Sequence, residues 1–408
     1  MDAQVRLAEA VPARVLAVCT TLEAAGYEAV IVGGCVRDVI LGRNPKDWDV
    51  ATSAHPDEVL KLFRHTIATG LQHGTVTVVT GKGKETHVEV TTFRGEGAYS
   101  DARRPDQVTF GVPLVEDLAR RDLTVNAIAY DAAKKSIVDP FGGIADIESK
   151  KLRAVGTAVD RFTEDGLRVM RAVRFAAQLE FDLEPDTEAS IAPALPSLSK
   201  VSRERVCDEL RKLLEARQPS RGLDPAVRTG ILANILPELP IVDAGEWLAR
   251  IDRAPVEVRL AAMMIPLGDG KRTADILKAL KFSNQEAELA SVLVEYANVE
   301  LEDDQPPTVR RMFADIAKPK RRAAIALWTA MPRPALAKVA SEVISDPLDT
   351  GDLAVKGKDI MTALAIEPGP KVGRILEVLL ERVLENPALN TREKLIDEAQ
   401  RLELELPL

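Results

Sequence analysis

Short apolar runs alternate with turns between about residues 28 and 155, and the runs are rich in β-branched residues. Such runs, bounded by glycine and polar residues, predict strands. The predicted strands cover residues 29–32, 75–80 and 87–92. Helical spacing predicts helices over 35–41 and 56–63, the second opened by Ser53 and by Pro56 in its first turn. The first part of the chain is therefore predicted to be an α/β head.

From about residue 160 the strand pattern gives way to apolar positions at helical spacing, for example over 201–216 and 372–384. The apolar face of the second helix consists of Val372, Ile375, Leu376, Leu379, Leu380 and Val383. Turns rich in proline and glycine separate the helices. We predict a head over 1–155, a helical neck over 156–230, a helical body over 231–310 and a helical tail over 311–408. The predicted fold class is α+β, a mixed sheet with helices followed by an all-α remainder.

Composition and charge narrow the class of protein. The chain has 408 residues, of which 46% are hydrophobic and 29% charged, and these proportions indicate a folded globular protein. Its net charge of −9 argues against binding a polyanion over the whole surface, so a nucleic-acid site must be a local patch. Three cysteines are too few and too scattered for a disulfide framework or a CxxC zinc site. Because no leader pattern and no long apolar run occur, we expect a cytoplasmic protein with no membrane segment.

The first candidate site is a strand-to-helix junction at Gly33 and Gly34. Glycines there let backbone amides approach a phosphate closely, while the helix N-terminus and Arg37 add positive charge. Asp47 and Asp49 follow and are two residues apart, so on a strand both carboxylates point to the same face and can share hard cations such as Mg²⁺. An isolated Asp-x-Asp is more often a solvated turn. The neighbouring glycines and Arg37 favour a two-metal site that activates an attacking hydroxyl.

Glu89 is a third candidate carboxylate. It lies on the strand predicted over 87–92, and that strand could pair beside the one that starts at Trp48 and Asp49. In that arrangement Glu89 joins Asp47 and Asp49 at the reaction centre. The alternative is a plain charge on an edge strand, and the pattern favours neither.

Four ordered motifs carry a resemblance to a known family. They lie at 33–49 (GGCVRD, LG and KDWD), 120–127 (RRDLTVNA), 139–143 (DPFGG) and 164–175 (EDGLRVMRAVRF). Together they resemble the class II tRNA nucleotidyltransferase and bacterial poly(A) polymerase family, which belongs to the polymerase-β-like nucleotidyltransferases. The resemblance implies that the head is a polymerase-β-like nucleotidyltransferase domain containing the catalytic palm. It also implies Mg²⁺-dependent transfer with release of pyrophosphate, and tRNA, CTP and ATP as partners.

In the last motif Glu164 and Asp165 precede Arg168, Arg171 and Arg174, which recur every three residues on a predicted helix. Cytosine and adenine each present a donor beside an acceptor, so a carboxylate next to a guanidinium complements both, whereas uracil and guanine present the reverse order. The alternative is an exposed helix face with weak ion pairs. The resemblance implies that Asp165 and Arg168 read the base, with Glu164 in support.

The same resemblance implies further contacts with the nucleotide. The residues expected to touch it are Gly33, Gly34, Arg37, Arg121, Arg171 and Arg174. Asn126 is expected at the ribose, and Asp122 is expected to orient Arg121.

The family includes enzymes that add CCA, only CC or only A to tRNA, and enzymes that make poly(A) tails. Residues 70–78 resemble the tRNA-enzyme version of their strand, and residues 93–105 resemble the loop needed for the final A, which CC-adding enzymes typically lack. We therefore predict addition of C, C and A, with an A-adding enzyme or a poly(A) polymerase as alternatives. A catalytically silent RNA-binding protein would be expected to lack Asp47 and Asp49, which are both present.

Stretches at 355–360, 368–374 and 390–393 are similar to the family's tail, which grips the tRNA elbow. A helix that starts after Gly369 could bind phosphate through its N-terminus, and a plain surface helix is an equal alternative. Other candidate phosphate contacts are Arg203 with Arg205, Arg211 with Lys212, and Lys318 with Lys320, Arg321 and Arg322. The pattern makes no prediction of oligomeric state.

Overall fold

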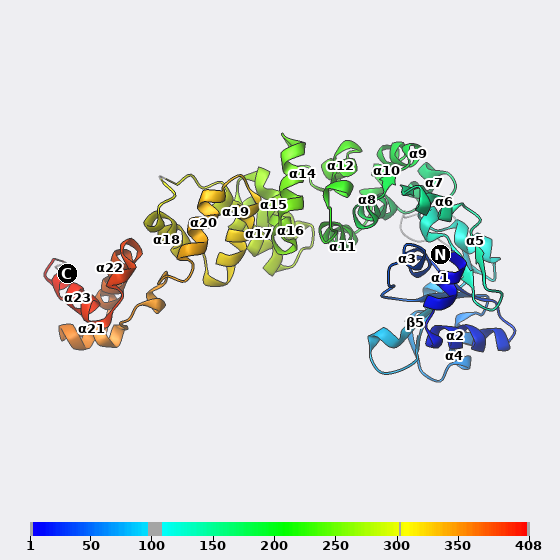
Figure 1. Ribbon diagram of the computed structural model, residues 1–408, viewed down its shortest axis with the longest axis horizontal. Helices are drawn as coiled ribbons and strands as arrows, with labels where there is room; N and C mark the ends of the chain where they lie inside the picture. The colour runs from blue at the N-terminus through cyan, green and yellow to red at the C-terminus, as the bar shows by residue number, and fades with distance from the viewer. Residues whose placement is uncertain (1–2, 97–107, 302, 406–408) are drawn as a thin grey trace. The chain divides into compact units, whose positions relative to one another are not determined.

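The computed structural model describes residues 3–96, 108–301 and 303–405, coloured along the chain in Figure 1. The chain forms two compact units, unit 1 (Met1–Pro237) and unit 2 (Glu238–Leu408). The finer division predicted at 155, 230 and 310 stays a prediction.

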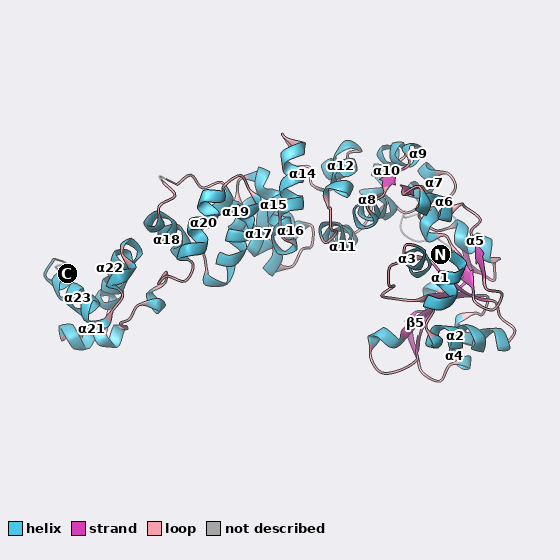
Figure 2. Cartoon of the chain, viewed as in Figure 1, coloured by secondary structure: helices cyan, strands magenta, loops and turns pink. Residues whose placement is uncertain are grey.

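Unit 1 contains a seven-stranded sheet in the order β3-β4-β5-β2-β1-β8-β9. Strands are drawn in magenta in Figure 2. Its strands are β1 (Ala29–Val32), β2 (Asp49–Thr52), β3 (Thr66–Gly70), β4 (Thr75–Val79), β5 (His87–Thr92), β8 (Ala129–Asp131) and β9 (Ser136–Val138). The β2–β5 pair is parallel and the other five neighbouring pairs are antiparallel. The predicted mixed sheet is confirmed, and the three predicted strands correspond to β1, β4 and β5.

Every residue of β1 is buried, so both faces of the sheet are covered at this strand. On one face Val30 and Val32 join a core cluster with Phe93 and Leu118. Helices α2 (Ala13–Ala24), α3 (Gly34–Ile40) and α4 (Pro56–Leu62) pack against strands of the sheet. The predicted cap of α4 was wrong, since its N-terminus is closed by a Glu58 carboxylate that accepts from the His55 amide, and Ser53 instead accepts from the Glu28 amide.

The rest of unit 1 is mainly helical. Its helices are α5 (Leu114–Ala119), α6 (Gly143–Glu148), α7 (Ala158–Glu164), α8 (Leu167–Leu179), α9 (Pro185–Ala189), α10 (Ile191–Leu198), α11 (Arg203–Leu214), α12 (Ser220–Arg228) and α13 (Ile231–Ile235). One short strand, β11 (Asp182–Leu183), lies in the stretch expected to be all-helical and pairs in parallel with β10 (Lys151–Leu152). Two residues are too short for an alternating pattern, so this strand gives no signal in the sequence.

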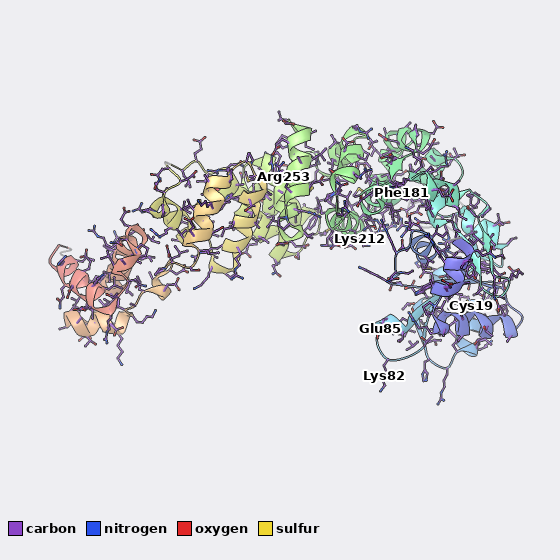
Figure 3. All side chains as sticks on the ribbon, viewed as in Figure 1. Cys19, Lys82, Glu85, Phe181, Lys212 and Arg253 are labelled. Carbon is purple, nitrogen blue, oxygen red and sulfur yellow. The ribbon has the colours of Figure 1, made fainter. Side chains whose placement is uncertain are left out.

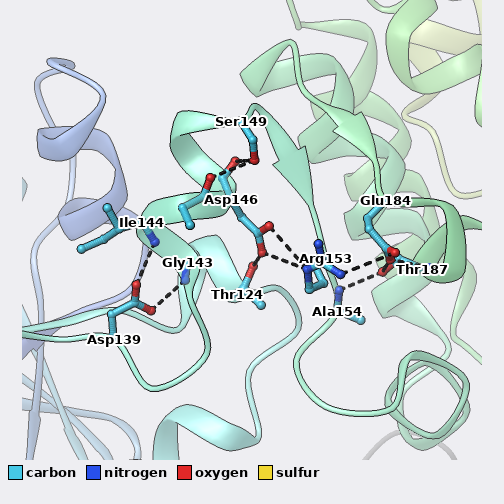
Figure 4. A network of polar contacts seen from close by, with 11 residues as sticks. Thr124, Asp139, Gly143, Ile144, Asp146, Ser149, Arg153, Ala154, Glu184 and Thr187 are labelled. Carbon is cyan, nitrogen blue, oxygen red and sulfur yellow. Dashed lines mark hydrogen bonds and ion pairs between the residues drawn. The ribbon is translucent and has the colours of Figure 1, made fainter.

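A polar network joins the sheet-bearing part of unit 1 to its helices (Figure 4). Asp139 of the DPFGG motif accepts hydrogen bonds from the Gly143 and Ile144 amides and so caps α6. Asp146 of α6 is buried, accepts from the Thr124 hydroxyl at 2.6 Å and pairs with Arg153 at 3.3 Å. Further on, Arg153 pairs with Glu184, which caps α9. The network therefore fixes the 3-10 turn η3 (Thr124–Asn126), which carries the predicted ribose contact.

Within its described residues, unit 2 contains helices and no strand. Its α-helices are α14 (Ala244–Arg253), α15 (Val256–Met264), α16 (Gly270–Ala279), α17 (Asn284–Ala297), α18 (Pro306–Asp315), α19 (Arg321–Ala330), α20 (Pro334–Val343), α21 (Gly357–Leu364), α22 (Pro370–Glu385) and α23 (Arg392–Glu405). The helix predicted over 372–384 lies inside α22, and its apolar face packs into a core with α21 and α23. Among the described helices, none is both long enough and apolar enough to cross a membrane.

The basic cluster at 318–322 is not a continuous exposed track. Arg321 is only 2% exposed, pairs with Asp349 at 2.9 Å and donates to the carbonyl oxygens of Phe313 and Ile316. Its guanidinium therefore ties together backbone segments of unit 2. The three cysteines are buried and free; Cys19 is labelled in Figure 3.

Candidate active site

Unit 1 encloses a cavity of about 1180 Å³ at the end of β1, bordered by α3, α8 and α11. Eleven predicted site residues line it: Gly34, Arg37, Asp47, Asp49, Arg121, Asp122, Asn126, Asp165, Arg168, Arg171 and Arg174. The three remaining predicted residues lie beside lining residues. Gly33 precedes Gly34, Glu89 pairs with Asp49 across two strands, and Glu164 contacts Arg168. The fold thus brings distant segments of the sequence to one place.

A steric requirement explains the glycine at position 33. Gly33 has a φ of +81°, which side-chain-bearing residues rarely adopt, and a Cβ there would lie 2.7 Å from Nη1 of Arg121. Gly34 begins α3 and is less crowded than Gly33. A Cβ at position 34 would have Nη2 of Arg37 as its nearest neighbour, at 3.5 Å. The first glycine therefore allows Arg121 to approach the backbone at the cavity wall.

The predicted carboxylates occupy neighbouring positions. Asp47 and Asp49 both line the cavity; Asp49 is the first residue of β2, and Asp47 lies in the bend just before it. The parallel pairing of β2 and β5 places Glu89 opposite Asp49. Burial, with repulsion from Glu89 and Asp47, raises the pKa of Asp49 to about 6, and Arg121 opposes the rise. A cation beside Asp49 would relieve this repulsion, so the donor set fits a hard divalent ion.

No group of three or more His, Cys, Asp or Glu side chains is arranged around a common point in the part of the chain that the structure describes. Glu89 does not line the cavity and is exposed. The geometry therefore supports Asp47 and Asp49 as the metal-holding pair more directly than it supports Glu89.

The side chains that line the cavity carry a net positive charge, whereas the whole chain carries a net negative charge. Eleven arginine and lysine side chains line it against six aspartate and glutamate side chains, an excess of five positive charges. The whole chain has a net charge of −9. This local concentration matches the expected basic patch and suits a polyanionic ligand such as a triphosphate.

Asp122 is the centre of a hydrogen-bond network in the cavity wall. Its carboxylate accepts from Nε of Arg171 at 2.7 Å, from the Asn126 amide side chain at 3.0 Å and from the Leu123 backbone at 2.9 Å. Asn126 in turn accepts from Arg37. Although burial opposes ionisation, Arg171 and the hydrogen bonds hold the pKa of Asp122 well below its usual range. Asp122 thus fixes Arg171 and Asn126.

The predicted role of Asp122 in orienting Arg121 is supported in the described residues only by charge attraction, without a direct contact between the two side chains. Arg121 instead pairs with Asp117, at 3.6 Å between Nη2 and Oδ2, and Asp117 also pairs with Arg120 at 2.9 Å. Asp117 is only 1% exposed. Its positions three and four residues before the two arginines are the signal in the sequence that could have identified it.

Arg168 and Asp165, the predicted base readers, are held by different partners. Arg168 donates to the Glu164 carboxylate at 2.8 Å and to the carbonyl oxygens of Arg161 and Arg120, each at 3.0 Å. Asp165 accepts from the Leu167 amide and from Nη2 of Arg205, also at 3.0 Å. Glu164 therefore lies where a supporting residue is expected.

Helix α11 supplies two partners that the sequence did not reveal. Arg205 pairs with Asp165, and Glu209 pairs with Arg174 at 3.0 Å. These two α11 residues are four apart and so share one helix face. Burial lowers the pKa of Arg174 to about 10, and Glu209 opposes this shift. Arg205 was expected in a phosphate track, but it pairs with Asp165, a candidate base reader. Lys212 of α11 also lines the cavity.

A mixed sheet with paired carboxylates beside an arginine-lined cavity defines a nucleotidyltransferase. Residues 29–153 match the family described as "Poly A polymerase head domain". Residues 180–241 match "Probable RNA and SrmB- binding site of polymerase A", and residues 256–399 match domain 2 of tRNA nucleotidyltransferases.

Similar whole proteins narrow this class. The CCA-adding enzymes of Lactiplantibacillus plantarum and Geobacillus thermodenitrificans are each 39% identical over 393 residues, spanning 93% of this chain and 94% of theirs. The crystal structure of the Bacillus stearothermophilus CCA-adding enzyme in complex with CTP is 34% identical, with a TM-score of 0.77 over 96% of this chain and 97% of that one. This chain belongs to the CCA-adding enzyme family of tRNA nucleotidyltransferases.

Proposed function

We propose that the chain adds C, C and A in turn to the 3′ end of tRNA, from CTP and ATP, and releases pyrophosphate at each step. The observation that carries this proposal is the arginine-lined cavity beside Asp47 and Asp49, in a chain similar to CCA-adding enzymes over 93% of its length. We place this activity in the cytoplasm and take tRNA as the macromolecular partner.

Asp47 and Asp49 would hold Mg²⁺, with Glu89 as the neighbouring third carboxylate. When bound, Mg²⁺ lowers the pKa of the attacking 3′-hydroxyl and neutralises charge on the leaving pyrophosphate. Arg37, Arg121, Arg171 and Arg174 line the cavity and bind the triphosphate. Asn126 hydrogen-bonds to the ribose, and the backbone at Gly33 and Gly34 approaches the phosphates.

Selection of the base falls to Asp165 and Arg168, which both line the cavity. The carboxylate accepts from the exocyclic amine of cytosine or adenine, while the guanidinium donates to the adjacent ring nitrogen. Uracil and guanine set acceptor against acceptor and donor against donor. Arg205 holds Asp165, so the acceptor is oriented before the nucleotide arrives.

An Arg168→Ala substitution is expected to lower kcat/KM for CTP by about 10- to 100-fold and to raise UTP incorporation relative to CTP, because the donor that opposes uracil is gone. It also leaves the Arg161 and Arg120 carbonyls without this donor, so the unfolding temperature should fall. Single-turnover incorporation of each nucleotide checks the prediction. Arg168→Lys keeps a cation and serves as the matched variant; unchanged selectivity in Arg168→Ala would place base reading elsewhere.

The helix α22 begins directly after Gly369 and carries Lys371 and Arg374 in its first turns. We propose that this end of α22 contacts tRNA phosphates. We propose that the segment 93–105 is needed for the final A; residues 97–105 of this segment lie outside the described residues.

The test uses three tRNA transcripts that end at the discriminator base, at C and at CC, with CTP and ATP supplied separately and together. Completion of all three to CCA followed by arrest is the expected result. Extension of only the CC-ending transcript would identify an A-adding enzyme. Long A tails would identify a poly(A) polymerase.

A further inference from the structure

One aromatic ring lies within the arginine cluster of the cavity. Phe175, on α8, lines the cavity although its side chain is only 7% exposed. The guanidinium carbons of Arg174, Arg37 and Arg171 lie 4.0, 5.1 and 5.4 Å from the centre of this ring. All three distances are within the range in which a cation is attracted to the face of an aromatic ring.

The three guanidinium groups come from two helices. Arg171 and Arg174 share α8 with Phe175, whereas Arg37 belongs to α3. The spacing of four residues from Arg171 to Phe175 places both side chains on one helix face. The ring therefore links the glycine-junction helix to the helix that carries the predicted base-reading motif.

Each of these arginines also has its own acidic partner. Arg37 pairs with Asp38 at 2.8 Å, Arg171 with Asp122 at 2.6 Å and Arg174 with Glu209 at 3.0 Å. Another carboxylate at the ring's position would hold the arginines but would also reduce the positive charge offered to a triphosphate. A phenyl ring attracts cations through its quadrupole and carries no net charge. It can thus hold the cluster without neutralising it.

We propose that Phe175 is a positioning residue that holds Arg37, Arg171 and Arg174 oriented toward the triphosphate of the incoming nucleotide. This inference rests on the proposed function of the cavity. It attributes to an uncharged side chain a share of the affinity for CTP and ATP alike, because the triphosphate is common to both. It gives Phe175 no part in choosing the base.

The test compares Phe175→Leu with Phe175→Trp and with a full-length protein that carries a multiply fluorinated phenylalanine at position 175. Leucine removes the ring, tryptophan strengthens the cation–π contact, and fluorination withdraws electron density with little change of shape. Equilibrium binding of CTP and ATP without tRNA is measured first, followed by kcat and KM on a CC-ending transcript.

We expect leucine and the fluorinated ring each to weaken the binding of both nucleotides, by roughly 5- to 30-fold for leucine, with kcat changed less than about 3-fold. Tryptophan should retain more affinity than leucine. Phe181→Leu is the matched control, because Phe181 is a buried phenylalanine just beyond α8 that does not line the cavity, and nucleotide binding by this variant should match the wild type.

Wild-type affinity in the fluorinated protein would overturn the proposal, since the ring would then act only by filling space. Equal affinity of Phe175→Leu and the wild type would overturn it as well. Failure of the proposed function would look different, because the wild-type protein would then bind nucleotides without extending any of the three transcripts.

Discussion

Replacing Asp49 by alanine is expected to lower the rate of CMP and AMP incorporation by roughly 10³-fold or more, because the substitution removes a ligand of the divalent ion. Affinity for tRNA, measured by gel retardation, should stay close to that of the wild type, since Asp49 holds a metal and not a phosphate. Without Mg²⁺, the unfolding temperature should not fall. The raised pKa of Asp49 means that its ionised carboxylate is disfavoured in the folded protein, so its removal relieves burial and repulsion.

Asp57→Ala is the matched control for this experiment. Asp57 is an exposed residue of α4 outside the cavity, and its replacement removes the same group from the same unit. Its incorporation rate should equal that of the wild type. Turnover by Asp49→Ala at the wild-type rate would contradict the metal assignment. If the unfolding temperature of Asp49→Ala fell by a large amount, the loss of turnover would be explained by misfolding instead.

Local patterns predicted the parts of the site that are close in sequence. Asp49 begins the strand β2, as its pattern predicted, and Asp47 precedes that strand; both residues line the cavity. The junction at Gly33 was identified because strand, glycine pair and helix follow one another directly. The regular spacing of Arg168, Arg171 and Arg174 predicted the helix that carries them, α8. These predictions succeeded because backbone periodicity alone determines which side chains share a face.

Partners that are distant in sequence could not be predicted. Asp165 and Arg205 are 40 residues apart, and Asp122 and Arg171 are 49 apart. Their pairing depends on how α8 packs against α11 and η3, which no local pattern specifies. The partner assigned to Asp122, Arg121, came from the family resemblance, and adjacent side chains generally point in different directions. Asp117, one helical turn from Arg121, is the partner instead.

The charges that line the cavity explain how a chain with a net negative charge can bind a triphosphate. Asp122, Glu209 and Asp117 are buried, and each pairs with at least one arginine. These pairs orient the guanidinium groups, while the lining keeps an excess of positive charge. The charged residues outside this lining are net negative, so the chain does not attract nucleic acid over its whole surface, and contacts with nucleic acid depend on local basic groups.

An Asp122→Asn substitution is expected to destabilise unit 1 by about 2–3 kcal/mol. Breaking a buried ion pair is costly because a charge remains without its partner, but Arg171 is 35% exposed and water compensates in part. For a unit of this size the loss corresponds to a fall of roughly 4–12 °C in unfolding temperature. Nucleotide binding should weaken too, since Arg171 and Asn126 lose the carboxylate that orients them.

The pH dependence gives this prediction a second readout. Because the pKa of Asp122 is lowered in the folded protein, its stabilising effect is complete above the unfolded-state pKa of about 4 and is lost as the pH falls further. Calorimetry should therefore show the largest gap between wild type and Asp122→Asn near pH 7, with the gap narrowing below about pH 4. Asp224→Asn is the control, because Asp224 and its partner Arg228 are both about half exposed and the change should cost less than about 1 kcal/mol. Equal losses in the two variants would mean that the Asp122 network does not stabilise the cavity wall.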